Sequence, residues 1–295
     1  MTTYTFGEKP DSSAIGSIVE LPTATYPGWV LCNGSTVNSS TYPTLYSLLG
    51  STALTNVVSQ FNGDSGTISD LSGASWTNTS VTQNTSTYKY GTGSLSFNGS
   101  TSHLVATDSS NWDLGQSASP FTVECWFYVT SSLATAQYTL ISRGGTTASW
   151  STTGGYMYLF YTFTNGTINF SYNNAGTAVT LSSAASSITT NTWYHAAAVS
   201  TGSLVTLYLN GVSVATSSTV TITKPSSSTL MNIGTTINSN ANPFPGYMDN
   251  IRITKGIAQY TSNFTPANIP SPTSTPSVPN IAPTTYTSFY MRSDV

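Results

Sequence analysis

The chain has 295 residues, a length that suits one large domain or two smaller ones. Charged residues make up only 6% of it, against about 25% in ordinary soluble proteins, whereas hydrophobic residues reach 38% and aromatic residues 12%. Intrinsic disorder combines high charge with few aromatic and β-branched residues. The composition therefore predicts that most of the chain folds.

The few charges exclude several classes of partner. The net charge is −3 and the seven basic residues are scattered along the chain, whereas binding to nucleic acid phosphates needs clustered Lys and Arg. No apolar run approaches the ~20 residues that span a bilayer. The first residues also lack a basic segment followed by an apolar one, so we expect no nucleic acid, no membrane insertion and no secretory signal.

In chain order, residues 1–13 are predicted to form an arm, and residues 41–50 are the one segment with helix signals. Pro43 suits a first helical turn and Gly50 a C-terminal cap. Beyond residue 56 the pattern has period two and is rich in β-branched and aromatic residues, which is typical of strands. The clearest strands are expected at 121–129, 156–161 and 193–199.

Residues 121–129 place Phe121, Val123, Cys125, Phe127 and Val129 on one face, and large aromatic residues on the other, so both faces are expected to be covered. Residues 204–214 are predicted to form a hairpin, because Asn210-Gly211 supplies the positive φ angles of a type I′ turn. Many short strands separated by Ser/Thr/Asn/Gly loops predict an all-β, antiparallel sandwich.

Two further features concern the cysteines and the C-terminal end. Cys32 and Cys125 each lie among apolar residues, so we expect both to be reduced packing residues. From residue 269 to 295 the chain reads as a proline-rich extended linker that ends in an aromatic segment at 285–291. That segment is expected to dock on another surface.

The first 55 residues carry a family resemblance. Gly16-Ser-Ile-Val-Glu20, Tyr26-Pro-Gly-Trp-Val-Leu-Cys-Asn-Gly-Ser35 and the segment 41–50 together resemble the phage tail-collar domain, over residues 14–55. The Leu-Pro-Asp-Leu-Arg-Gly segment usual in that family is missing. The resemblance implies attachment to other virion proteins and a homotrimer.

A second set of motifs covers residues 56–268. Asp70-Leu-Ser-Gly73, Tyr90–Gly99, Phe121–Trp126, Thr192–His195, Leu207–Gly211 and Gly246–Gly256 occur in an order that resembles the laminin-G-like, concanavalin A-like jelly-roll family. The resemblance implies binding of glycans or proteins at loop-built rims. Trp76, Trp150 and Tyr156 are the aromatic residues expected to contact a ligand there.

Some members of that family hold calcium, a cation that binds six to eight oxygen ligands. The resemblance places Asp70 and Asp249 as candidate ligands, although Ala74 stands where such relatives carry Asn. The alternative is structural: Asp70 would make an Asx-turn, and Asp249 would pair with Arg252 or Lys255. Calcium is the only cofactor that the sequence suggests.

Catalytic signals are weak. His195 is expected to be a hydrogen-bonded structural residue, and His103 has no neighbours at metal-ligand spacing. Glycosidases use two carboxylates across a sugar, but Glu124 has no acidic companion on its strand. We therefore expect no enzymatic activity, and a depolymerase would need an acid pair that the sequence does not reveal.

Together these features predict a concanavalin A-like jelly roll with a small N-terminal collar-like module and an extended Pro-rich C-terminal tail. The leading hypothesis is a phage tail fibre or adhesin that attaches by its N-terminal module and displays a lectin-like domain for host-surface glycans. The alternative is a capsid decoration or cement protein that projects the jelly roll from the head.

Overall fold

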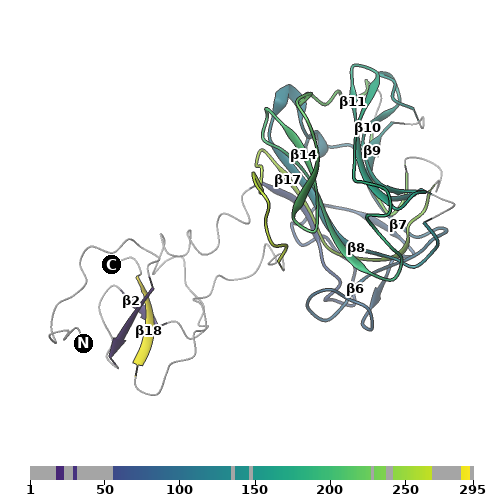
Figure 1. The fold of residues 1–295 in the computed structure, drawn as a ribbon. Helices are drawn as coiled ribbons and strands as arrows, with labels where there is room; N and C mark the ends of the chain where they lie inside the picture. Colours follow the sequence, from purple (N-terminus) through teal and green to yellow (C-terminus); the bar gives the residue numbers. More distant parts are fainter. Residues whose placement is uncertain are drawn as a thin grey trace. The chain divides into compact units, whose positions relative to one another are not determined.

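A computed structural model describes residues 18–22, 29–31, 56–133, 137–145, 149–226, 229–236, 242–267 and 287–292. The chain divides into two compact units (Figure 1). One unit is formed by residues 1–55 together with 273–295, and the other by residues 56–272.

The larger unit is a sandwich of two antiparallel sheets. The strands of its first sheet are β4 (Thr77–Thr79), β7 (His103–Ala106), β9 (Tyr138–Gly144), β10 (Tyr156–Phe163), β11 (Thr167–Asn174), β12 (Thr177–Ser182) and β16 (Leu230–Ile233). The strands of its second sheet are β3 (Val57–Phe61), β5 (Thr82–Asn84), β6 (Ser94–Asn98), β8 (Phe121–Val129), β13 (Trp193–Ser200), β14 (Val205–Leu209), β15 (Val212–Ser217) and β17 (Pro245–Lys255).

The order of strands is β12-β11-β10-β9-β16-β7-β4 in the first sheet and β15-β14-β13-β8-β17-β6-β5 in the second, where β3 pairs with β17. The described helices are two short 3-10 turns, η1 (Ser110–Trp112) and η2 (Gln116–Ala118). The prediction of an all-β antiparallel sandwich is confirmed.

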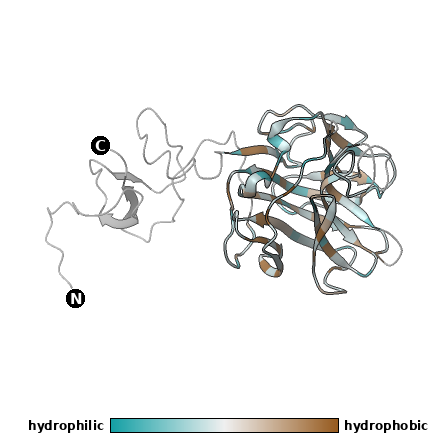
Figure 2. Ribbon diagram, turned by 90° about the horizontal axis from the view of Figure 1, so that it is seen from above, coloured by the Kyte–Doolittle hydropathy of each residue, from teal (hydrophilic) through white to brown (hydrophobic). Residues whose placement is uncertain are grey.

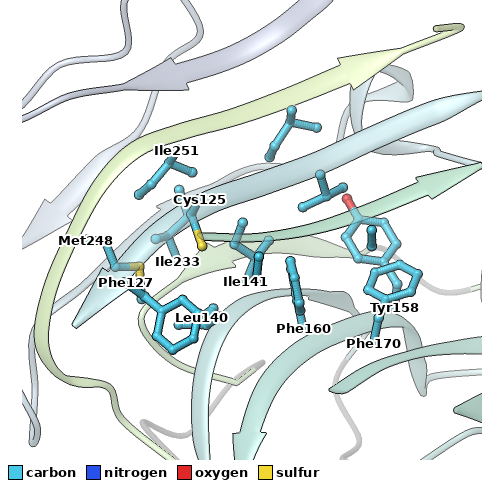
Figure 3. Close-up of a cluster of buried hydrophobic side chains, with 14 of the residues drawn as sticks. Cys125, Phe127, Leu140, Ile141, Tyr158, Phe160, Phe170, Ile233, Met248 and Ile251 are labelled. Atoms are coloured by element: carbon cyan, nitrogen blue, oxygen red, sulfur yellow. The ribbon is translucent and has the colours of Figure 1, made fainter. Parts of the chain in front are cut away.

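Strand β8 shows why these residues form this sandwich. Its predicted inward face is confirmed, because Phe121, Val123, Cys125, Phe127 and Val129 are all at most 1% exposed and belong to the core between the sheets. Figure 3 shows side chains from both sheets meeting in that core. Each fully buried Phe or Val contributes about 1.5–3 kcal/mol, so the alternating pattern alone strongly favours this register.

The second face of β8 is also covered, as the sequence predicts. Glu124 and Trp126 on this face are buried. The segment that follows β17 lies over this side of the sheet, where Tyr260 and Phe264 pack against Ala197 and Tyr208. The rings of Tyr260 and Phe264 are stacked, with centroids 3.5 Å apart.

Cys125 is free and buried, in agreement with the expectation that it is a packing residue. Burial, together with the nearby charge of Glu124, raises the pKa of its thiol, so the thiol stays protonated at neutral pH. Cys32 lies outside the described residues.

The hairpin predicted at 204–214 is confirmed as β14 and β15, with Leu209 opposite Val212. Asn210 and Gly211 have φ angles of 50° and 79°, which a type I′ turn requires. A Cβ atom on Gly211 would lie 1.9 Å from the carbonyl oxygen of Phe264, whose amide donates to Gly211. The turn therefore also anchors the segment that covers the second sheet.

Strand β17 changes its neighbour along its length. Residues 245–248 pair with β6, and residues 251–254 pair with β3. Between the two halves the ladder to β8 has a bulge after Asp249, and Asn250 has a φ of 45°. A bulge disrupts the ladder locally and leaves the extra residue unpaired, and Asp249 lies directly at this interruption.

The smaller unit contains a three-stranded sheet built from both ends of the chain. Its strands are β1 (Ile18–Pro22), β2 (Trp29–Leu31) and β18 (Thr287–Arg292), in the order β1-β18-β2. Residue 290 lies opposite Val19 in one ladder and Leu31 in the other. The aromatic C-terminal segment therefore docks as the central strand, in the unit formed by residues 1–55 and 273–295. The arm at 1–13, the helix expected at 41–50 and the proline-rich stretch at 270–283 lie outside the described residues.

Figure 2 shows hydrophobic residues distributed along the strands of the sandwich, separated by paler and hydrophilic positions. Among the described parts of the chain, no helix has the length and apolarity needed to cross a membrane.

Candidate functional site

Two of the three aromatic residues expected to contact a ligand lie together. The rings of Trp150 and Tyr156 are 5.3 Å apart at an angle of 47°, and they pack with Leu159 and Tyr161. Trp150 comes from the loop before β10, and Tyr156 is the first residue of that strand. Tyr156 is buried at 7% exposure and Trp150 is half-buried, so Trp150 is the member of the pair that can present its ring to a ligand.

Trp76 lies elsewhere. Its ring contacts Phe61 edge-on at 5.4 Å and Trp112 at 5.5 Å, and its indole Nε1 donates to Asp70 at 2.9 Å. These contacts occupy both the ring and the polar atom of Trp76. The side chain holds the first turn of the jelly roll against the core.

The Asx-turn predicted for Asp70 is confirmed. Its Oδ1 accepts from the amide of Ser72 at 2.7 Å and from the Ser72 hydroxyl at 2.6 Å. Its Oδ2 accepts from the Ser59 hydroxyl at 2.5 Å and from Trp76. The carboxylate thus ties β3 to the following turn.

Asp249 lies at the point where β17 stops pairing with β6 and begins to pair with β3. Its Oδ2 accepts from the amides of Lys89 and Tyr90, both at 3.0 Å, and its Oδ1 accepts from the amide of Asn250 at 2.7 Å. Burial raises the pKa of Asp249, and the three amide hydrogen bonds oppose that rise. The alternative prediction that Asp249 pairs with Arg252 or Lys255 is wrong. Arg252 instead binds Glu124, and Lys255 donates to the carbonyl of Ser110.

These donor sets do not fit a calcium ion shared by Asp70 and Asp249. The carboxylate oxygens of both residues are engaged by N–H and O–H donors, whereas calcium binds six to eight oxygen ligands and two carboxylates supply at most four. The partners of Asp70 come from segments 59–76, and those of Asp249 from residues 89, 90 and 250. Within the described ranges, no group of three or more His, Cys, Asp or Glu residues could hold a metal ion.

We therefore expect melting curves recorded with calcium and after chelation to overlay. A folded state that bound calcium at a hundredfold excess over Kd would gain about 2.7 kcal/mol, and Tm would rise by several degrees. Calorimetry on the full chain and on Asp249→Asn tests this. A calcium-dependent rise in Tm that Asp249→Asn removes would restore the calcium hypothesis.

The one Glu of the jelly roll is held in a buried cluster. The Glu124 carboxylate accepts from Arg252 at 2.7 Å, from His195 Nε2 at 3.0 Å and from the Tyr260 hydroxyl at 2.8 Å. Glu124 is 0% exposed and His195 is 1% exposed. His195 is thus the hydrogen-bonded structural residue that the sequence predicts, and the cluster has no access for a substrate.

A second cluster of charges was not predicted, because its members are far apart in sequence. Arg143, which is fully buried, forms ion pairs with Asp108 and Asp113, and Lys224 bridges the same two carboxylates at 3.1 Å. Burial opposes ionisation of Asp108, but hydrogen bonds from Arg143 and Lys224 hold its pKa at about 2. A carboxyl group that is ionised at neutral pH cannot supply the proton that a glycosidase acid must donate.

A groove of about 680 Å³ opens at one end of the sandwich, where three loops meet. The loops follow β8, β10 and β12. The lining residues are Thr130, Ser132, Leu133, Thr164, Asn165, Gly166, Ser186, Ile188, Thr189 and Thr190. Sequence reasoning missed this groove, because loops rich in Ser and Thr occur throughout the chain and nothing local distinguishes these three.

Comparisons with known proteins agree with the two resemblances. Residues 98–258 match the family model described as the concanavalin A-like lectin/glucanases superfamily. Residues 16–68 match the phage tail collar domain, a range that extends past residue 55 and beyond the end of β3. No protein of curated function matches the chain in sequence.

Solved structures share the fold at low sequence identity. The binding domain of Paraclostridial mosquitocidal protein 1 matches with a TM-score of 0.53 and 18% identity, over 70% of this chain and 50% of that one. The receptor binding domain of botulinum neurotoxin D matches with a TM-score of 0.52 and 14% identity, over 72% of this chain and 51% of that one. The chain therefore spans about half the length of these toxin domains.

Domain 4 of AbnA, an extracellular arabinanase from Geobacillus stearothermophilus, was solved in complex with arabinotriose. It matches with a TM-score of 0.50 and 17% identity, over 69% of this chain and 94% of that one. The fold, the two-sheet topology and the family model agree over more than half of the sequence. The chain belongs to the concanavalin A-like lectin/glucanases superfamily and carries a phage tail collar domain at its N-terminal end.

Proposed function

We propose that this protein is a non-enzymatic phage virion component, a tail fibre or adhesin that attaches by its collar module and displays a lectin-like domain to the host surface. The observation that carries the proposal is the presence of a phage tail collar domain and a concanavalin A-like domain in one chain. Fold alone does not assign function, but here each of the two domains supports one half of an adhesin.

Three features support glycan recognition by the jelly roll. Its surface is rich in Ser, Thr and Asn and poor in charge, which suits hydrogen bonding to sugar hydroxyls. Trp150, half-buried and packed against Tyr156, supplies a ring that can stack on a sugar. A structural neighbour of the same fold, domain 4 of AbnA, was solved with arabinotriose.

The state of Glu124, Asp108 and Asp113 supports a binding role over catalysis. Glu124 is buried beneath Tyr260 and paired with Arg252, while Asp108 and Asp113 are neutralised by Arg143 and Lys224. None of these groups stands free to act as the acid of a glycosidase pair. By analogy with collar-containing fibres, we also propose a homotrimer that contacts other virion proteins.

Gold-labelled antibodies against residues 56–268, imaged on intact virions, test the proposal. We expect labelling at the tail. Labelling of the head would instead establish the alternative, a capsid decoration or cement protein that projects the jelly roll. Turnover of a host polysaccharide by the purified protein would overturn the non-enzymatic assignment.

A further inference from the structure

The groove between the loops that follow β8, β10 and β12 has a lining without charged residues. All ten of its residues are uncharged, and seven of them carry a hydroxyl or carboxamide group. These groups both donate and accept hydrogen bonds, as sugar hydroxyls do. Leu133 and Ile188 are the two aliphatic residues of the lining, and both are buried.

The lack of charge extends well beyond the lining. Between Arg143 and Lys224 the sequence contains no Asp, Glu, Lys or Arg residue, and two of the three loops of the groove fall in this stretch. Carboxylate and phosphate groups on a ligand are recognised mainly by Arg and Lys. Arg143 itself is fully buried and paired with two carboxylates. The groove therefore suits a neutral ligand.

Hydrogen bonds between the loops hold the groove in shape. The amide of Ser186 donates to the carbonyl of Asn165 at 2.8 Å, and that of Ile188 donates to Gly166 at 3.0 Å. Gly166 has a φ of 70°, and a Cβ atom there would lie 2.8 Å from the carbonyl oxygen of Ile188. Only glycine allows this close approach. Because these hydrogen bonds already hold the loops in place, ligand binding costs little conformational entropy of the loops.

An exposed aromatic residue comes directly before the groove residue Thr164 in the sequence. Phe163, the residue before Thr164, is 43% exposed, and its ring contacts Tyr161 edge-on at 6.2 Å. Because Phe163 adjoins the lining residue Thr164 in the chain, it is the exposed ring to test for packing against a sugar.

We propose that this groove is a binding site for a neutral saccharide, formed by residues 130–133, 164–166 and 186–190 with Phe163 beside it. The proposal rests on the glycan-binding role proposed above and adds a place and a chemical class to it. The site lies at the Phe163 end of β10, whereas Trp150 and Tyr156 lie at the start of that strand. The two surfaces can therefore be tested separately.

The experiment uses the full chain on an array of neutral oligosaccharides (hexose- and N-acetylhexosamine-terminated) beside sialylated and uronate-containing ones. The variants are Asn165→Trp, which fills the groove from an exposed side chain, and Phe163→Ala, which removes the ring. Thr216→Trp, on the exposed edge strand β15, is the matched control for surface Trp. Equal melting temperatures establish that each variant is folded.

We expect binding to neutral saccharides only, and an affinity loss of about tenfold or more for Asn165→Trp and Phe163→Ala but not for Thr216→Trp. Preference for acidic saccharides, or no binding to any neutral one, would overturn the proposal. If Trp150→Ala abolishes binding while both groove variants retain it, the proposal that the groove binds the saccharide is wrong, whereas the proposed adhesin function is unaffected. Tail labelling without binding to any saccharide would instead remove glycan recognition from the proposed function.

Discussion

Replacing Glu124 by Gln is expected to lower the free energy of unfolding by about 3–5 kcal/mol, the usual cost of removing one partner of a buried ion pair. The carboxylate is fully buried, and it accepts from Arg252, His195 and Tyr260. A neutral amide would leave the Arg252 guanidinium buried without a counter-charge. Urea denaturation followed by tryptophan fluorescence measures the loss.

The double variant Glu124→Gln/Arg252→Met is the matched control. Removing both partners leaves no buried charge, so we expect part of the lost stability to return. A loss below about 1 kcal/mol for Glu124→Gln alone would contradict this account, because that is the value of an exposed pair.

The same residue determines part of the acid stability. Burial opposes ionisation of Glu124, but the hydrogen bond from His195 and the charge of Arg252 hold its pKa below its ordinary value of 4.5. A depressed pKa in the folded state means that the unfolded chain binds the proton more readily. The stabilisation is therefore complete above about pH 5 and is lost as the pH falls further. Glu124→Gln is expected to flatten this acid limb of the stability curve.

A structural feature of this protein could be predicted from the sequence where it depends on neighbouring residues, and not where it depends on contacts between distant segments. The inward face of β8 and the Asn210-Gly211 turn were predicted correctly. Both depend on local patterns, namely period-two alternation and a residue pair that favours positive φ angles. The Asx-turn of Asp70 is equally local. The placement of Asp249 was not predicted, since it depends on the switch of β17 from β6 to β3, which no local pattern encodes.

The candidate sites follow the same division. Trp150 and Tyr156 were selected as aromatic residues near loops, and the structure brings them together. Trp76 looked similar in sequence but packs between Phe61 and Trp112. The groove combines the β10–β11 hairpin loop with two connections that cross between the sheets, β8–β9 and β12–β13. These loops are up to about sixty residues apart in sequence, and only the closing of the sandwich places them side by side.

The smaller unit shows a long-range pairing of another kind. Its central strand, β18, comes from the opposite end of the chain to its neighbours β1 and β2. The jelly roll thus lies within the sequence of the unit that holds both termini, as an insertion between residues 55 and 273. Domain insertions are tolerated where the two ends of the inserted unit lie at its surface.

This arrangement predicts that the C-terminal strand is required for attachment as much as the first 55 residues are. Because β1 and β2 each pair with β18, the change Tyr290→Pro should disrupt the strand on which both ladders depend. Proline removes one ladder donor, and its fixed φ and ring exclude it from central strands. Without their central strand, β1 and β2 lack the minimum sheet that is stable in water.

We expect Tyr290→Pro, and a chain that ends at residue 284, to keep the melting transition of the jelly roll but to be lost from purified particles. A chain that lacks residues 1–55 should behave in the same way. Ser277→Pro, within a segment already rich in proline, is the matched control and should be incorporated normally. Immunoblots of purified virions measure incorporation. If the truncated chain joins particles as well as the full chain does, the C-terminal strand has no part in attachment, and the module is confined to the N-terminal residues.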